Sequence, residues 1–391
     1  ARMRFVLDAY AARSCPLKTV HAFTPELIAP SLTRPTPRWF HNADEVESGL
    51  FEHLLDAGAL DLRDLREQPS EVQERACVAA MRNGVDVIIG GLLPRDYDNH
   101  RSGRPSLLVR SPDGSGYHPV QVKFHKVTEQ APEETELEVS TLEAPRVRSG
   151  LRGRAYRWSG RLNAALQVSH YWRLLEASGF AAAAPEAGLI GLERLQVGEG
   201  GPQRQLIAWL DLNADVVAPN PRMTPVPEAA SPISVLDRYE AEHAFRVRLA
   251  EQANAASGDA PLLTPIVSPE CAHCAWQRHC LDQLDDDDLS LRISKAPLDV
   301  FEILALRDLG VSTVAHLAAM ELDEVLGEYL PRVSHRPGGE QRLRVAQRRA
   351  RMLSEGIVLE RQTEGPIDLP RHELEIDIDI ETNRDDRAYL W

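Results

Sequence analysis

The sequence lacks any run of about 18 apolar residues, which excludes a transmembrane helix. It also lacks a secretory signal peptide, because the apolar segment near the N-terminus is short and carries Asp8 early. Cysteine is scarce: the chain has five, and their clustering suits a reducing compartment better than a disulfide framework. We therefore expect a cytoplasmic protein with no membrane partner.

An excess of positive charge is missing as well. The 391 residues carry a formal net charge of −15, which argues against a general nucleic-acid coat protein. This charge does not exclude an enzyme that acts on nucleic acid, since such enzymes often gather their basic residues in one groove. The length predicts two or more domains, and a hydrophobic content of 43% is enough for sizeable cores.

Three cysteines lie close together in a C-x2-C-x5-C pattern, and a fourth lies near the N-terminus. The expected ligands are Cys15, Cys271, Cys274 and Cys280, which we call the four-cysteine site. Neighbouring thiolates can converge on one centre, and four of them hold either zinc or an iron–sulfur cluster. His273 and His279 are additional candidate ligands, so zinc remains an alternative to the cluster. Reduced cysteines without a metal are the third alternative.

One early cysteine followed by a late C-x2-C-x5-C ties the two ends of a domain together, whereas a zinc ribbon usually takes its ligands as two local pairs. The arrangement resembles the iron–sulfur staple of RecB-like PD-(D/E)XK nucleases, which also begin with a helix that ends in Cys-Pro. The resemblance implies a 4Fe–4S cluster, with zinc as the alternative. It also implies an α/β fold built on a restriction-endonuclease-like core.

A helix is expected over residues 42–60, with Asn42 as its N-cap. The nuclease family has a Gly-x-x-x-His in this helix, which Gly49 and His53 match, and Glu52 matches an acid that related nucleases place there. The resemblance therefore implies that Glu52 and His53 belong to the catalytic site. A solvated Glu–His pair on an amphipathic helix is the alternative.

Three strands are expected next, over residues 85–93, 105–110 and 117–126. In the family, an Asp on one strand and an (Asp/Glu)-x-Lys on the next bind Mg²⁺ or Mn²⁺ and steady the attacking water. Lys123 matches the lysine, but Gln121 and Ser106 stand where the two carboxylates are expected. Neither supplies the charge that Mg²⁺ prefers. Unless a loop brings Asp96, Asp98, Asp113 or Glu52 into the site, we expect slow or absent cleavage.

The segment 162–178 predicts an amphipathic helix that ends at Gly179. Gln167 and Tyr171 are four residues apart, so they share one face of this helix. Their Q-x3-Y pattern resembles the motif that RecB-like nucleases place beside the active site. The resemblance implies that both residues contact DNA and order the metal ligands.

Two charged segments lie between the third strand and this helix. Residues 128–143 are rich in glutamate and are expected to form a mobile acidic loop. Residues 146–161 carry arginines interleaved with Tyr156 and Trp158, which suits a phosphate-binding and stacking surface. The alternative is a flexible loop whose arginines are held to nearby acids.

The part of the chain after the cysteines predicts helices. A run of four aspartates, 285–288, is expected to be a solvated linker, and 300–330 is largely helical up to Pro331. Residues 306–318 resemble a helix-hairpin-helix, in which Gly310 allows the tight turn and backbone N–H groups face a phosphate. On the following helix we expect DNA-backbone contacts from Arg344, Arg348 and Arg349. A plain helical hairpin and a solvated basic face are the alternatives.

Alternating residues over 374–382 predict a strand. Within it, Asp379-Ile380-Glu381 resembles the first D-x-E of RNase H/DnaQ-type exonucleases, whose acids bind two metals.

Together these patterns predict three parts: a RecB-like PD-(D/E)XK domain over 1–284, a helix-hairpin-helix region over 290–357, and the first strands of a truncated RNase H-like domain over 370–391. The resemblance implies a metal-dependent DNA nuclease in repair or recombination, with DNA and a helicase or other repair protein as partners. A non-catalytic DNA-binding module that serves a C-terminal exonuclease and a zinc-stapled protein-interaction scaffold are the alternatives.

Overall fold

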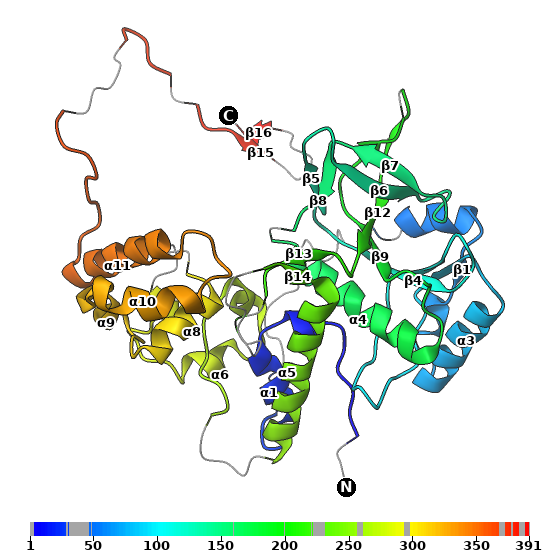
Figure 1. The fold of residues 1–391 in the computed structure, drawn as a ribbon, viewed down its shortest axis with the longest axis horizontal. Helices are drawn as coiled ribbons and strands as arrows, with labels where there is room; N and C mark the ends of the chain where they lie inside the picture. The colour runs from blue at the N-terminus through cyan, green and yellow to red at the C-terminus, as the bar shows by residue number, and fades with distance from the viewer. Residues whose placement is uncertain are drawn as a thin grey trace.

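The computed structural model describes residues 4–28, 30, 47, 49–158, 160–198, 200–219, 221, 231–255, 261–292, 298–366, 372–376, 378–382 and 388–390. A large sheet and a group of four helices lie at opposite ends of the molecule, and the long helix α5 (Val235–Ala255) stands between them (Figure 1). Asn42, the predicted N-cap, lies outside the described residues.

The large sheet has eight strands in the order β1-β2-β3-β4-β9-β12-β6-β7. Their bounds are β1 Leu60–Asp61, β2 Val87–Ile89, β3 Leu107–Arg110, β4 Tyr117–Val122, β6 Glu136–Thr141, β7 Ser149–Arg152, β9 Glu186–Ile190 and β12 Leu206–Asp211. β2, β3 and β4 form an antiparallel meander, and β9 then pairs with β4 in parallel. The fold is therefore mixed α/β, as the sequence predicted.

Four two-stranded ribbons complete the β structure of the described residues. They pair β5 (Thr128–Gln130) with β8 (Arg154–Tyr156), β10 (Leu195–Gln196) with β11 (Gln203–Arg204), β13 (Asp215–Val217) with β14 (Ile233–Ser234), and β15 (Glu381–Thr382) with β16 (Ala388–Leu390). The helices before the cysteines are η1 (Ala11–Arg13), α1 (Pro16–Phe23), η2 (Arg63–Leu65), α3 (Ser70–Arg82) and α4 (Leu162–Ser178), besides α5.

Helices cover both faces of the sheet. The helical residues 49–56 bury Leu50, Phe51 and Leu54 in the cluster that covers one face. On the other face, α4 buries Leu174 and Leu175 against β2 and β3. α4 matches its predicted bounds and ends at Gly179, whose φ of 76° is the left-handed conformation that glycine adopts readily. α4 is the last element of the connection between the parallel strands β4 and β9, after β5 to β8.

Two short helices carry late cysteines, η3 (Pro269–His273) and α6 (Gln277–Leu281). The second core belongs to the helices that follow them: α7 (Leu289–Arg292), and then α8 (Val300–Asp308), α9 (Val314–Ala319), α10 (Leu322–Arg332) and α11 (Gly339–Glu355), which we call the four-helix region. Leu306, Leu317, Tyr329 and Leu343 form the centre of a hydrophobic cluster separate from those of the sheet. α10 continues through Pro331 to Arg332, two residues beyond its predicted end at residue 330. Across the described ranges, no helix is both long and apolar enough to cross a membrane.

The predicted mobile acidic loop over 128–143 is wrong. Thr128–Gln130 form β5, and Glu136–Thr141 form β6 within the large sheet. Leu137 and Val139 are buried, and Glu136 and Glu138 alternate with them on the exposed side of the strand. The period of two was hidden because the segment is dominated by glutamate, a residue that is depleted in strands.

The predicted solvated linker at the four aspartates holds for Asp285 and Asp286, which are exposed, but is wrong for Asp287 and Asp288. Asp288 is only 5% exposed, and its carboxylate accepts a hydrogen bond of 2.8 Å from Arg307 Nη2. Asp287 accepts a hydrogen bond of 2.9 Å from the backbone N–H of Ala315, in the first turn of α9. The run joins the four-helix region to the preceding chain because its carboxylates pair with donors of that region.

The predicted strand over 374–382 forms only at its end. Among the described residues of this segment, Glu381 and Thr382 alone are in a strand, β15. Leu374 and Ile376 are 77% and 72% exposed, so the alternating apolar residues have no sheet to cover. Asp379 and Glu381 are exposed as well.

Candidate functional site: a four-cysteine site beside a hydrogen-bonded lysine

The four cysteines line one cavity. Cys15 directly precedes α1, Cys271 lies in η3, Cys274 follows η3, and Cys280 lies in α6. Glu270 connects the two ends of this domain, because its carboxylate accepts a hydrogen bond of 3.0 Å from the backbone N–H of Cys15, 255 residues earlier. The structure therefore brings together the four side chains that the sequence singled out.

The cysteines repel one another as thiolates. Burial, together with the nearby charges of Cys15, Cys274 and Cys271, raises the pKa of Cys280 to about 11. Burial is also the main cause of the raised pKa of Cys15. A metal or cluster bound between the sulfurs would offset both effects, because its positive charge stabilises thiolates. The donor set thus fits a thiolate-bound group.

His21 also lines this cavity, and the sequence analysis did not identify it. Its ring lies 4.7 Å from that of Trp276 and 4.9 Å from that of His279, measured between centroids. Burial lowers the pKa of His21 to about 4, so the ring is neutral at pH 7. Within the described part of the chain, no group of three or more His, Cys, Asp or Glu side chains is arranged to hold a single metal ion.

Ser106 and Gln121, at the predicted carboxylate positions, form hydrogen bonds with each other. The register of β3 and β4 pairs Leu107 with Val120, so Ser106 and Gln121 form the next pair. Gln121 Nε2 donates a hydrogen bond of 2.8 Å to Ser106 Oγ, and the backbone N–H of Ser106 donates one of 3.3 Å to Gln121 Oε1. Two neutral side chains thus occupy these positions and continue the pairing of the strands.

Lys123 follows β4 directly and points to α4. Its Nζ donates a hydrogen bond to Gln167 Oε1, and Gln167 Nε2 donates one of 3.1 Å to the hydroxyl of Tyr171. Gly103 leaves room for this tyrosine, since a Cβ at that position would lie 2.6 Å from Tyr171 Cε1. The sequence predicted that these three side chains lie together, and the structure joins them in one hydrogen-bonded chain.

The charge of Lys123 is unfavourable in this place. Burial, together with the positive charge of Arg13, lowers its pKa to about 7. No carboxylate of the described residues is among the groups that shift this pKa. Lys123 therefore exists as a mixture of charged and neutral forms at neutral pH.

This pKa predicts a pH-dependent effect of Lys123→Met on stability. The folded pKa lies below the unfolded value of about 10.4, so the unfolded chain binds more protons between about pH 7 and pH 10.4. The cost of keeping the lysine buried is therefore full below pH 7 and falls as the pH rises through this window. We expect Lys123→Met to stabilise the protein by about 1–2 kcal/mol at pH 6, after allowance for partial exposure, and less at pH 10.

Chemical denaturation at several pH values would measure this difference. The matched control is Lys126→Met, at an exposed position three residues later. A gain from Lys123→Met that stays the same from pH 6 to pH 10 would contradict the buried, easily neutralised lysine.

Glu52 and His53 are placed differently from the other predicted catalytic residues. Both are exposed, and they lie on the helical residues 49–56, which cover the face of the sheet opposite α4. Their catalytic role stays a prediction. Of the loop acids that could replace the missing carboxylates, Asp113 accepts hydrogen bonds from Ser111 and Ser115 in the β3–β4 turn, which hold its pKa at about 2. That turn is at the other end of β4 from Lys123.

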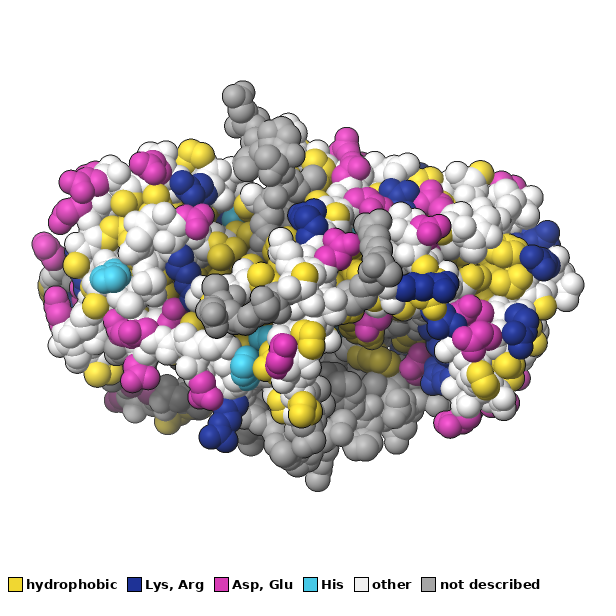
Figure 2. Space-filling model, turned by 90° about the horizontal axis from the view of Figure 1, so that it is seen from below, with side chains coloured by type: hydrophobic (Ala, Val, Ile, Leu, Met, Phe, Trp, Pro, Cys, Tyr) yellow, Lys and Arg dark blue, Asp and Glu magenta, His cyan; other side chains and the backbone are white. Residues whose placement is uncertain are grey.

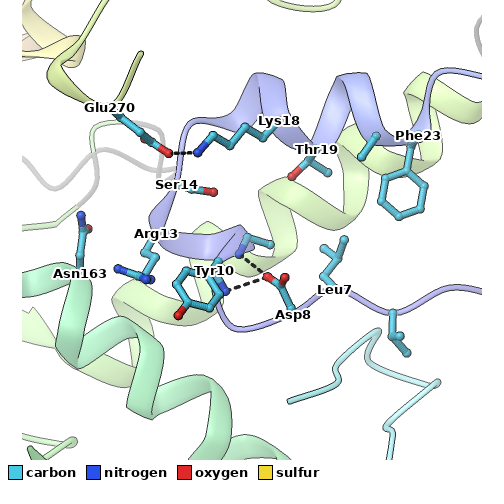
Figure 3. A pocket seen from close by; sticks show the side chains of 13 residues that line it. Leu7, Asp8, Tyr10, Arg13, Ser14, Lys18, Thr19, Phe23, Asn163 and Glu270 are labelled. Atoms are coloured by element: carbon cyan, nitrogen blue, oxygen red, sulfur yellow. Dashed lines mark hydrogen bonds and ion pairs between the residues drawn. The ribbon is translucent and has the colours of Figure 1, made fainter. Parts of the chain in front are cut away.

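Figure 3 shows a cavity between the N-terminal segment and α4 that sequence reasoning did not find. Arg13 from η1 and Asn163 from α4 point toward one another, and the guanidinium carbon of Arg13 lies 4.1 Å from the ring centre of Tyr10. The effect of Arg13 on the pKa of Lys123 places this guanidinium near the hydrogen-bonded lysine. The only signal in the sequence was its position two residues before Cys15.

The predicted DNA-binding residues lie in the four-helix region. Gly310 ends the turn after α8 with a φ of 82°, which suits glycine. Arg344 and Arg348 of α11 are each about half exposed and pair with Glu340 and Glu360. Such exposed ion pairs are weak, so a phosphate can replace the carboxylate. On the face of the molecule shown in Figure 2, cationic and anionic side chains are interspersed.

In the arginine-rich segment 146–161, arginines are held to nearby acids, as the second interpretation expected, but the predicted flexible loop is wrong because the segment contains β7 and β8. Arg148 donates hydrogen bonds of 3.1 Å to Glu138 and 3.2 Å to Glu186. Its guanidinium carbon lies 3.4 Å from the ring centre of Trp209. Arg146 pairs with Asp86 at 2.7 Å in the same way.

Comparisons with protein-family models, with curated proteins and with solved structures gave no match to this chain.

Proposed function

We propose that the chain is a DNA-processing protein of the RecB-like nuclease type, which acts on DNA in repair or recombination and whose own cleavage is slow or absent. The observation that carries this proposal is the hydrogen-bonded chain Lys123–Gln167–Tyr171 at the end of β4, beside the Ser106–Gln121 pair. It brings together the lysine of the (D/E)-x-K position and both residues of the Q-x3-Y pattern.

The topology supports the same proposal. A helix over 49–56, the meander β2–β3–β4, the helix α4 and the parallel strand β9 occur in the order expected of a PD-(D/E)XK core, with β5 to β8 inserted between β4 and α4. The four-cysteine site supports it further, since Cys15 meets the late cysteines across the whole of this core. A 4Fe–4S cluster held by these thiolates would act as a structural link between the two ends of the domain. Cysteine ligands of this kind stay reduced in the cytoplasm, so the proposed site fits a cytoplasmic protein.

A second candidate is a non-catalytic DNA-binding module that positions DNA for another nuclease domain or a repair protein such as a helicase. The mutual hydrogen bonds of Ser106 and Gln121 favour it, because neutral side chains fill the places of both metal-binding carboxylates. Both candidates require DNA binding, and cleavage distinguishes them.

The test of DNA binding is a salt titration of duplex and single-stranded DNA affinity. We expect log affinity to fall linearly with log salt, because each phosphate contact releases counterions. Replacing Arg344, Arg348 and Arg349 with alanine should reduce the slope by about two to three, at about 0.9 per lost contact, with no change in sequence preference. The control is Arg152→Ala, on the exposed side of β7. An unchanged slope in the triple variant would remove α11 from the DNA surface, and undetectable binding to any DNA would end the proposal.

A further inference from the structure

A third cavity, of about 480 Å³, lies where η1, α4, α5 and α8 meet. Four arginines line it: Arg13, Arg238, Arg246 and Arg307. We call it the arginine cavity. The four come from parts of the chain far apart in sequence, so their convergence was not visible in any motif.

Two of these arginines share one carboxylate. Glu242 accepts a hydrogen bond of 3.3 Å from Arg238 and one of 3.1 Å from Arg246, which lie one helical turn to either side of it on α5. The three side chains are buried, with exposed fractions of 10%, 4% and 6% for Arg238, Arg246 and Glu242. One buried positive charge therefore has no carboxylate of its own, which is costly in a poorly solvated place.

The other charged groups of the wall are engaged with different partners and do not remove this excess. Arg307 pairs with Asp288 at 2.8 Å, Glu270 with Lys18, and Asp308 with Arg332 at 3.2 Å. Arg13 adds to the excess, because no described residue accepts a hydrogen bond from its guanidinium; it only stacks on Tyr10.

Hydrogen-bond donors remain available in the same wall. Each guanidinium has five N–H groups. Arg238 uses one for the Ala218 carbonyl and one for Glu242, and Arg246 uses one for the Ser14 carbonyl and one for Glu242. The Nε–H groups of both are buried without an acceptor, as is that of Arg13. Buried donors of this kind normally have partners, and an anionic group in the cavity would supply an acceptor.

The rest of the wall is apolar. It includes Leu162, Leu166, Leu262, Leu263, Phe301 and Leu304. Arg238 itself lies 6.0 Å from the ring centre of Phe301. A volume of this size suits a small ligand that carries both an anionic group and a flat apolar part. Inorganic phosphate alone would leave the apolar wall uncovered.

We propose that the arginine cavity binds a nucleotide, with its phosphate at Arg13 and Arg238 and its base against the wall of Phe301 and Leu304. The shared chemistry is one phosphate next to one base, and it has two possible sources: a free mononucleotide or one unit of a single DNA strand. The second source rests on the proposed function, since it would extend the DNA-binding surface to a site between the sheet domain and α8. Phosphate recognition by guanidinium and stacking of a base on an aromatic ring are the usual means of binding single strands.

The test uses the full chain without added divalent metal, so that binding is measured apart from cleavage. Isothermal titration compares dTMP, thymidine, inorganic phosphate and a short 5′-phosphorylated oligothymidylate. We expect saturable binding of dTMP, with thymidine and phosphate each at least about tenfold weaker. Tighter binding of the oligonucleotide than of dTMP assigns the site to a DNA strand, and the reverse order assigns it to a free nucleotide.

Two variants and a control test the residues. Arg13→Gln and Arg238→Gln should each weaken dTMP binding by about tenfold or more. Arg238→Gln is expected to fold, because Glu242 and Arg246 then form a matched pair; circular dichroism and thermal unfolding check this. Arg152→Gln, an exposed arginine on β7, should leave the affinity unchanged.

Either of two outcomes overturns the proposal: no saturable binding of dTMP or oligonucleotide up to about 10 mM, or wild-type affinity in both folded arginine variants. Loss of the proposed function would look different, because α11 variants would then fail to alter DNA binding while dTMP still bound in the arginine cavity.

Discussion

Cys15→Ser is expected to abolish the metal content of the four-cysteine site and to lower the free energy of unfolding by about 3–5 kcal/mol. Cys15 is the only one of the four ligands that lies at the N-terminal end of the domain, directly before α1. Losing it separates α1 from the segment of η3 and α6, leaving the hydrogen bonds of Glu270 as the remaining polar link. Anaerobic wild-type protein should be brown and contain iron; the variant should be colourless.

Iron and zinc analysis together with urea denaturation measure this result. Cys77→Ala is the matched control, because it also removes one thiol but lies in the core of α3, away from the four-cysteine site. It should lose stability through its cavity yet keep its full iron content. A colourless wild-type protein with one zinc per chain would show that the site holds zinc and not an iron–sulfur cluster. A Cys15→Ser protein that retains full iron would show that Cys15 is not a ligand.

The second large effect is expected from the double variant Ser106→Asp with Gln121→Asp. The two positions are directly opposite on β3 and β4, so their carboxylates would face each other across the strands. Without metal, like charges in a place where Ser106 is 8% exposed should destabilise the fold. Mg²⁺ or Mn²⁺ should reverse this, because two carboxylates supply the oxygen ligands that these ions prefer.

We expect the affinity for Mn²⁺ to rise at least about tenfold in the double variant, and its unfolding temperature to rise on addition of the ion. The wild-type protein should show neither effect, and cleavage of DNA should be slow or absent. The matched control is Ser106→Asn with Gln121→Asn, which has similar shape and no charge. Efficient Mg²⁺-dependent cleavage by the wild type that is abolished in Lys123→Ala would show that the missing carboxylates come from elsewhere, with Asp96, Asp98 and Glu52 the first to test.

Local patterns predicted the elements that position the site. α4 was predictable to the residue because its apolar period is regular and Gly179 ends it. β3 and β4 were predictable because β-branched residues flank a glycine-rich turn. β6 was missed, since glutamate on its exposed side outweighed Leu137 and Val139 on the other. Its pairing with β12 is decided by burial of those two side chains, which composition does not reveal.

In the candidate site, too, local sequence patterns predicted some features, whereas strand register and packing decide the others. The spacing of Gln167 and Tyr171 was enough to place both on one face of a helix, and the structure adds that Lys123 reaches that face. That Ser106 and Gln121 bond to each other depends on strand register, which no local pattern determines. The sequence shows that Arg238, Glu242 and Arg246 are spaced four residues apart. It does not show that the three side chains are buried, because their burial follows from packing against η1 and α8.

Cys15 lines two cavities at once, that of the four-cysteine site and the arginine cavity. The peptide before it is held from the second cavity, where Arg246 Nη2 donates a hydrogen bond of 2.8 Å to the Ser14 carbonyl. A cluster bound on one side of this wall and a nucleotide bound on the other would therefore act on the same few backbone atoms. Thermodynamic reciprocity would then apply: the factor by which a cluster changed nucleotide affinity would be the factor by which the nucleotide changed retention of the cluster.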